Sequence, residues 1–251
     1  MYTQIKTPEE IENMRKAGDI CSRVLKMLKD SVGPGKTTKQ LADMASEMIR
    51  DNGGEPSFLG YKDFPDVICI SLNEEVVHGI PDAKRVIHSG DIITFDLGVT
   101  YKGMIVDSAV SVLVDSNDKT RKMLLRVTEE SLAAGIRQLK DGCFTGDIGA
   151  AVEKVLKKNS LGVIRDLVGH GVGHQVHEEP NIPNYGKEGT GPRLRSGMTI
   201  AIEPMASLGT EDIYITSDGW TIKTGDDSLS AHFEQTVLLT PDGYEILTPF
   251  M

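Results

Sequence analysis

The sequence predicts an α+β fold in which two helix pairs pack against a mixed β-sheet. Helical periodicity occurs in two separate pairs of segments, and each pair is followed by short, β-prone apolar runs rather than by a regular alternation of strand and helix. The two parts of the chain also share residues at a constant offset of 107 positions, which is typical of a duplicated αβ unit.

The first helix is expected to begin at Thr7-Pro8-Glu9-Glu10. A capping Thr, a Pro at the first helical position and a Glu three residues after the cap coincide there. Its apolar positions continue to about residue 30, a second helix is expected over about 38–51, and a second pair over about 118–140 and 145–159. Strands are expected over about 67–72, 92–99, 104–114, 162–177, 198–208, 213–215, 220–223, 231–239 and 244–247.

The repeat joins a helix pair to an acid-bearing strand in each part of the chain. The offset of 107 relates Gly35 to Gly142, Thr38 to Thr145, Leu41 to Ile148, Asn52 to Asn159, Gly90 to Gly197 and Asp96 to Glu203. We therefore expect one domain over residues 1–251, with two pseudo-symmetric halves of about 1–115 and 116–251 whose acids meet at the junction.

Composition excludes several classes of protein. With 39% hydrophobic residues the chain can bury a sizeable core, and its net charge of −10 disfavours a specific nucleic-acid or membrane partner. The three cysteines, at positions 21, 69 and 143, have no metal-type spacing, as expected of a reduced cytosolic protein. The start of the chain has no apolar signal core and no run reaches transmembrane length, so we expect a cytoplasmic location.

Five metal-type ligands lie in or beside apolar, β-prone runs. A carboxylate in such a run is costly unless it is paired or bound to a cation. An oxygen-rich set with one imidazole suits a pair of divalent first-row metals better than a single structural zinc. The five residues are Asp96, Asp107, His170, Glu203 and Glu234.

The spacing of the first two ligands predicts a hairpin. If its turn centres between Tyr101 and Lys102, paired positions sum to 203, which places Asp96 directly opposite Asp107. Opposite residues share a face of the sheet, so the two like charges need a partner such as a metal ion. The alternative is that each Asp keeps a strand edge soluble or pairs with a Lys.

The order of the motifs along the chain resembles type I methionine aminopeptidases of the short bacterial form. The resemblance covers essentially the whole chain and implies the pita-bread fold, a pseudo-twofold α+β domain with a central antiparallel sheet, two helix pairs and a metal site at the sheet centre. The motifs are Val77-His78-Gly79-Ile80-Pro81, Gly169-His170-Gly171, His177-Glu178-Glu179-Pro180, Ile202-Glu203-Pro204-Met205 and Ser230-Ala231-His232-Phe233-Glu234.

This resemblance implies two divalent metal ions, of manganese, iron, cobalt or zinc. Asp107 and Glu234 would bridge them, Asp96 would chelate one, and His170 and Glu203 would complete the other. Glu203 would also accept the proton of the attacking water. His177 would stabilise the developing oxyanion, and His78 would contact the leaving amide nitrogen. The alternatives are that His78 caps a loop and that His177 is an exposed ion-pair partner of the glutamates that follow it.

The resemblance further implies that the enzyme removes the initiator methionine from nascent proteins whose second residue is small. It would act as a cytoplasmic monomer close to the ribosome. The side chain of methionine would enter an apolar pocket formed by Tyr61, Phe64, Cys69, Val176 and Trp220, with Phe58 at its rim.

Two alternatives share the same fold, namely a peptidase acting at Xaa-Pro bonds and a metal-free binding protein. The chain also departs from the family pattern around its last ligand, where His232 and Gln235 look interchanged. On a strand, His232 shares the face of Glu234, whereas Gln235 points the other way. His232 is therefore either a partner of the metal ligands or an ordinary packed histidine.

Overall fold

The computed structural model describes residues 5–251, and two helix pairs are its most prominent feature. The bounds of all four helices follow the sequence expectation closely, although the third ends at residue 136 rather than 140. A short 3₁₀ turn, η1, covers Tyr61–Asp63. The helices are α1 (Pro8–Ser31), α2 (Thr38–Asp51), α3 (Lys119–Ile136) and α4 (Thr145–Lys158).

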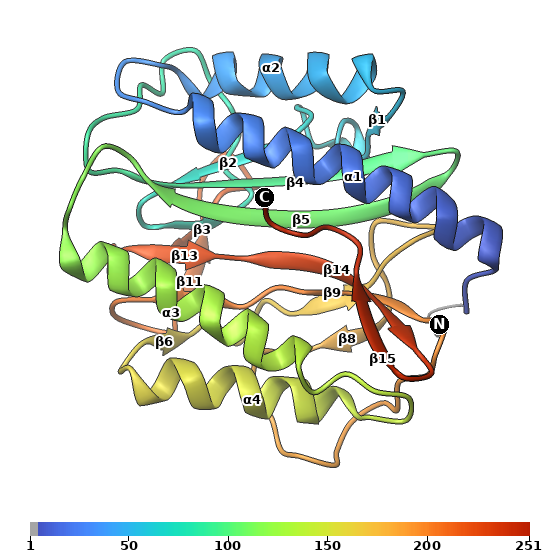
Figure 1. The fold of residues 1–251 in the computed structure, drawn as a ribbon. Helices are drawn as coiled ribbons and strands as arrows, with labels where there is room; N and C mark the ends of the chain where they lie inside the picture. The colour runs from blue at the N-terminus through green and yellow to red at the C-terminus, as the bar shows by residue number, and fades with distance from the viewer. Residues whose placement is uncertain (1–4) are drawn as a thin grey trace.

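The central sheet runs across both parts of the chain (Figure 1). Its strand order is β1-β4-β5-β14-β9-β7-β8, with β15 also pairing β14 and β2 also pairing β4. Its strands are β1 (Glu55–Pro56), β2 (Cys69–Leu72), β4 (Ile92–Tyr101), β5 (Met104–Leu113), β7 (Gly169–Gly171), β8 (Glu178–Ile182), β9 (Thr199–Ile202), β14 (Glu234–Thr240) and β15 (Gly243–Ile246).

Two smaller sheets of three strands flank the central one. Every strand pair in the described part of the chain is antiparallel, so the sheet is not the mixed one that the segment pattern predicted. The first small sheet contains β13 (Ser230–His232), β10 (Met205–Ser207) and β6 (Gly162–Val163), and the second contains β11 (Ile213–Ile215), β12 (Ile222–Thr224) and β3 (Glu75–Val77).

Helix α1 begins where its capping residues predicted. The Thr7 backbone N–H donates to the Glu10 carboxylate at 2.7 Å, and the Glu10 N–H donates to the Thr7 hydroxyl at 3.3 Å. These two bonds satisfy donors that a helix start otherwise leaves unpaired. The apolar side of α1 packs on β4 and β5, and α3 packs beside α4 on the other part of the sheet (Figure 1).

Strand β4 separates the hydrophobic core from the opposite face of the sheet. Phe95, Leu97 and Val99 are fully buried in the cluster that includes the apolar residues of α1. Because successive side chains alternate, Asp96 points to the face away from the helices. The same alternation on β5 places Val106 in the core and Asp107 on that opposite face.

The repeat is visible in the backbone. Helix α2 covers residues 38–51 and α4 covers 145–158, an offset of 107 at both ends. The turn before each helix contains a glycine in the left-handed region, Gly35 with φ of 89° and Gly142 with φ of 83°. Gly90 and Gly197, which precede the acid-bearing strands, have φ of 94° and 87°. All four positions favour glycine because a Cβ is disfavoured at positive φ.

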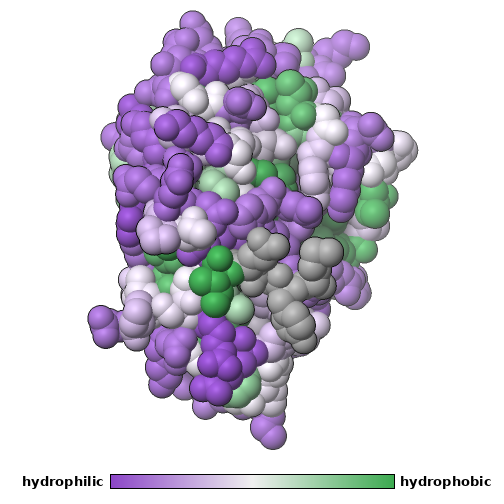
Figure 2. Space-filling model, turned by 90° about the vertical axis from the view of Figure 1, so that its right-hand side faces the viewer, coloured by the Kyte–Doolittle hydropathy of each residue, from purple (hydrophilic) through white to green (hydrophobic). Residues whose placement is uncertain are grey.

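The surface is mainly polar on the side drawn in Figure 2, where the hydrophobic side chains form small, separate patches. Within residues 5–251 no helix is both long and apolar enough to cross a bilayer. The three cysteines are buried and not disulfide-bonded.

Candidate metal centre

Asp96 and Asp107 lie on adjacent strands, although not directly opposite each other. The observed register pairs Asp96 with Ala109 and Asp107 with Gly98, so the predicted pairing is wrong by two residues. The reason is the turn, which is Lys102-Gly103, with φ of 47° and 80°. Two residues with positive φ form the tight turn that suits hairpin twist. Because the shift is an even number, both carboxylates still share one face.

Three further strands bring the remaining acids and the histidine to this face. Glu234 on β14 pairs with Ala109 of β5, and its neighbour Gln235 pairs with Ile202 of β9. His170 on β7 pairs with Ala201 of β9. Glu203 follows directly after β9. The site is thus built on five consecutive strands of the sheet, β4, β5, β14, β9 and β7.

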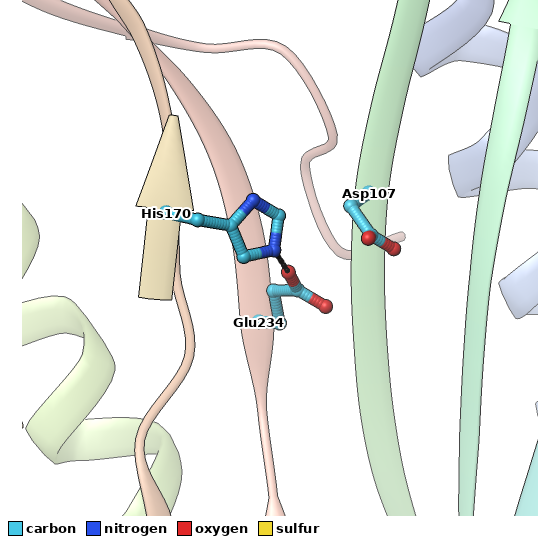
Figure 3. A group of neighbouring side chains, drawn as sticks. All are labelled: Asp107, His170 and Glu234. Carbon is cyan, nitrogen blue, oxygen red and sulfur yellow. Dashed lines mark ion pairs between the residues drawn. The ribbon is translucent and has the colours of Figure 1, made fainter. Parts of the chain in front are cut away.

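The closest group in this site consists of Asp107, His170 and Glu234, whose ligand atoms all lie within 4.8 Å of one another (Figure 3). The Nε2 atom of His170 lies 4.0 Å from a Glu234 carboxylate oxygen and 3.4 Å from Glu203 Oε1. Asp96 is buried beside them, with 7% of its surface exposed. The structure therefore brings together all five residues that the sequence singled out.

The hydrogen bonding of His170 leaves one ring nitrogen available as a ligand. Its Nδ1 atom lies 2.9 Å from the carbonyl oxygen of Gly171. A carbonyl oxygen only accepts, so Nδ1 carries the proton and Nε2 presents its lone pair to the carboxylates. Burial lowers the pKa of His170 to about 3, which keeps the ring neutral.

The carboxylates carry the electrostatic signature of a cation site. Burial raises the pKa of Asp96 to about 7, and burial together with neighbouring negative charge raises the pKa of Asp107, Glu203 and Glu234 well above the ordinary range. Among residues 5–251, one oxygen of Asp96 and one of Asp107 are buried and have no hydrogen-bond partner. Oxygens in this state are suited to binding a divalent cation, whose charge removes the repulsion between them.

A cavity of about 210 Å³ opens above these ligands. Its apolar wall includes five of the six residues expected to form the methionine pocket: Phe58, Tyr61, Phe64, Cys69 and Trp220. The sixth, Val176, belongs to the same buried cluster as Phe58 and Phe64 but does not line the cavity. Sequence reasoning did not assign a role to the other lining residues, Lys62, Val77, Leu167, Val168 and Met205.

Two histidines stand at the side of the cavity. His177 lies 2.9 Å from the Tyr61 hydroxyl through Nδ1, and its ring centre is 4.2 Å from that of His170. His78 has φ of 60°, a conformation uncommon outside glycine, and its ring contacts Trp220 edge to face. Burial lowers the pKa of both histidines to about 4. Both rings are therefore neutral hydrogen-bonding groups near neutral pH.

His232 is also part of this neighbourhood. Its Nε2 atom lies 3.7 Å from Glu203 Oε2, and burial lowers its pKa to about 3. The sequence indicated it by assuming one continuous strand over residues 231–239. That assumption is wrong, because β13 ends at His232 and β14 begins at Glu234, and the two strands belong to different sheets.

Comparison with known proteins agrees with this chemistry. The model of metallopeptidase family M24 matches residues 12–241. The methionine aminopeptidase of Clostridium acetobutylicum is 43% identical over 244 residues, covering 97% of this chain and 98% of that protein. Methionine aminopeptidase 1 of Bacillus subtilis is 43% identical over 243 residues, with the same coverage of both chains.

Solved structures separate two branches that share the fold. The crystal structure of methionine aminopeptidase from Thermotoga maritima has a TM-score of 0.96 and 44% identity, covering 98% of this chain and 99% of that one. Prolidase from Pyrococcus furiosus has a TM-score of 0.78 and 26% identity, and only 66% of its chain is covered. The pita-bread fold expected from the motifs is confirmed. The chain belongs to metallopeptidase family M24, among the methionine aminopeptidases.

Proposed function

We propose that this protein is a metal-dependent aminopeptidase that removes an N-terminal methionine from polypeptides whose second residue is small. The observation that carries the proposal is the convergence of buried carboxylates and one neutral imidazole at the base of an apolar cavity. The domain would comprise residues 1–251, with halves of about 1–115 and 116–251 that each supply ligands. The protein would act in the cytoplasm as a monomer, on nascent chains near the ribosome.

We assign the metal ligands to the five clustered residues. Asp107 and Glu234, on the paired strands β5 and β14, would be the ligands held in common by the two ions, as the family resemblance implies. Asp96 would supply a further ligand to one ion, and His170 and Glu203 would supply further ligands to the other. Manganese, iron, cobalt and zinc all bind such oxygen-rich sites with an imidazole, and metal availability often selects among them. Bound there, the ions would supply Lewis-acid activation of the substrate carbonyl and of water.

The remaining chemistry belongs to side chains at the cavity. Glu203 would accept a proton from the attacking water and deliver it toward the leaving amine, because it is the ligand with 13% of its side chain open to the cavity. When the Tyr61 hydroxyl donates to His177 Nδ1, the His177 proton is on Nε2, where it would donate to the developing oxyanion. His78 would contact the amide nitrogen of the second residue.

The apolar wall accounts for the choice of methionine. An unbranched thioether fits among Tyr61, Phe64 and Trp220 and gains from sulfur–aromatic contact. The charged ligands beneath would bind the free α-amino end of the substrate, which restricts the enzyme to chain termini. Phe58 at the rim would limit the size of the second residue.

The test is hydrolysis by purified protein after chelation and after return of Mn²⁺ or Co²⁺. We expect no hydrolysis in chelator, recovery with added ion, and cleavage of Met-Ala-Met-Met but poor cleavage of Met-Lys-Met-Met. Preferred cleavage of a Gly-Pro peptide would instead support an Xaa-Pro peptidase. Tight peptide binding without hydrolysis or metal uptake would support a metal-free binding protein.

A further inference from the structure

His232 is a buried histidine whose ring lacks hydrogen bonds. Only 1% of its surface is exposed, and neither Nδ1 nor Nε2 has a partner within the part of the chain that the structure describes. Leaving a buried polar group in this state is costly, and buried polar groups are nearly always paired. The ring therefore needs a contact that the resting arrangement does not complete.

The backbone of His232 is held firmly, which directs its ring. Its N–H donates to the Ser111 hydroxyl at 2.9 Å, and that hydroxyl donates to the His232 carbonyl oxygen at 2.9 Å. β13 also pairs with β10 through His232 and Met205. These contacts place the imidazole beside Glu203, which follows β9 and precedes β10.

The two oxygens of Glu203 each face a different imidazole. Oε1 lies 3.4 Å from His170 Nε2, and Oε2 lies 3.7 Å from His232 Nε2. His170 presents a lone pair there because its proton is on Nδ1. His232 has no such bond fixing its proton, so its Nε2 can carry the N–H. The distance exceeds the usual N–H···O range by about 0.5–1 Å, and the movement required to close it is a rotation of the Glu203 carboxylate about its broad terminal torsion.

We propose that His232 is a positioning residue for Glu203, whose Oε2 oxygen it holds by an Nε2–H hydrogen bond while Oε1 is directed to the site of reaction beside His170. The inference rests on the proposed role of Glu203 as ligand and base. The two interchanged residues, His232 and Gln235, then have different roles. His232 serves the carboxylate, whereas Gln235 donates to the Thr248 carbonyl oxygen at 3.1 Å, on the opposite side of its strand.

The experiment compares His232→Leu with His232→Gln in metal-stripped protein. Titration with Co²⁺ or Mn²⁺ by calorimetry should show affinity reduced about 10–100-fold in the Leu variant, as for loss of a group that orients a metal ligand. The visible absorption of bound Co²⁺ should change with it. The Gln variant keeps an N–H donor and should retain affinity within about threefold of the unmodified protein. A structural role for the ring would not produce this rescue.

Thermal unfolding of the metal-free proteins gives an independent reading. The His232 ring makes no hydrogen bond to the described residues of the metal-free protein, so His232→Leu should leave the melting temperature of that form unchanged or raise it. In the same variant, added metal should raise the melting temperature by less than it does in the unmodified protein. The matched control is Gln235→Leu, which also replaces a buried polar side chain, with 6% exposure, near Glu234. Since it breaks a formed hydrogen bond that faces away, it should lower the melting temperature without altering Co²⁺ affinity or absorption.

Unchanged affinity and Co²⁺ absorption in His232→Leu would overturn the inference. Should leucine prevent folding, His232→Met tests the same loss with a more flexible apolar side chain. Absence of metal binding in the unmodified protein would instead refute the proposed function, so the two failures are distinguishable.

Discussion

The two halves of the molecule have the same turn geometry but supply the site with different strands. Before α2, the Gly35 N–H donates to the Ile87 carbonyl oxygen and the Thr38 N–H to that of Arg85. Before α4, at the same offset of 107, Gly142 donates to Leu194 and Thr145 to Pro192. The helix caps agree as well, because Gln40 and Asp147 each accept the N–H three residues earlier at 2.8 Å.

The halves diverge where the ligands are. Asp96 lies within β4, which continues unbroken over residues 92–101. The corresponding segment is divided into β9 and β10, and its acid, Glu203, lies in the break before Pro204. Proline lacks the N–H that a strand ladder needs, so the break is expected there. The turns and the bond from residue 40 or 147 back to the cap backbone are thus shared, although Thr37 also caps α2 with its side chain and Phe144 cannot do so for α4. The ligand strands differ more, with two buried aspartates on continuous strands and a more exposed glutamate in a break.

The largest expected effect comes from removing one central ligand of each half. Asp107→Ala and Glu234→Ala should both reduce kcat/KM for a Met-Ala peptide by at least about 10³-fold, since losing one electrostatic stabiliser already costs about 10²–10³. Metal content after gel filtration should fall in both. Glu129→Ala, at an exposed position on α3, is the control. Retention of full metal content by only one of the variants would mean that the halves do not contribute equally.

The next comparison uses the two cavity histidines, one from each half. His177→Ala should lower kcat by about 10²–10³ if it supports the oxyanion, and His78→Ala should lower it by about 10²–10⁴ if it assists the leaving group. Metal content should stay at the unmodified level in both, because neither ring is assigned as a ligand. Loss of a stoichiometric ion from either variant would contradict these roles.

A third comparison concerns the ion pair between Lys6, before α1, and Glu178, in the second half of the chain. Lys6 donates to Glu178 at 2.8 Å in a nearly buried ion pair, and Glu178 also accepts the N–H groups of His174 and Gln175 beside His177. Lys6→Met should lower the free energy of unfolding by about 2–4 kcal/mol, since it leaves a mostly buried carboxylate without its cation.

The control for Lys6 is Arg15→Met, which removes an ion pair with Glu245 that is more than a third exposed on both sides. We expect at most about 1 kcal/mol for that surface pair. Urea unfolding of metal-free protein measures both changes. Equal losses would mean that the burial of Lys6 adds nothing to its contribution.

The smallest expected effect tests the matched turns directly. Gly35→Ala and Gly142→Ala should each lower stability by about 1–2 kcal/mol, because alanine is strained in the left-handed region. At position 142 the Arg193 side chain must also move, because a Cβ there would lie 2.6 Å from its guanidinium, whereas position 35 is open. Gly33→Ala, in the same turn as Gly35 but outside that region and with open space around it, should be neutral or slightly stabilising. Calorimetric melting measures all three. A change confined to one half would show that the two turns are not equivalent in energy.

Local chemistry determined much of the fold. The start of α1, the whole of α2 and the offset of 107 all follow from caps, turn glycines and apolar spacing, which act over a few residues. β1, β3 and β8 were not predicted, because they are short and contain Glu or Pro, and the ladder rather than the sequence pattern stabilises them. The hairpin register depended on which two residues took positive φ, a choice between neighbouring turns that the sequence left open.

For the candidate site, too, part was evident from the sequence and part only from the tertiary structure. The sequence alone identified four acids and one imidazole that apolar strands would not bury without a cation, and it drew attention to His232 by its spacing from Glu234. Only the tertiary structure decided that β4, β5, β14, β9 and β7 lie side by side in that order, that Val176 packs behind the cavity wall, and that His232 meets Glu203 rather than Glu234. Strand order and lateral contacts depend on pairing between distant segments, which no local pattern encodes.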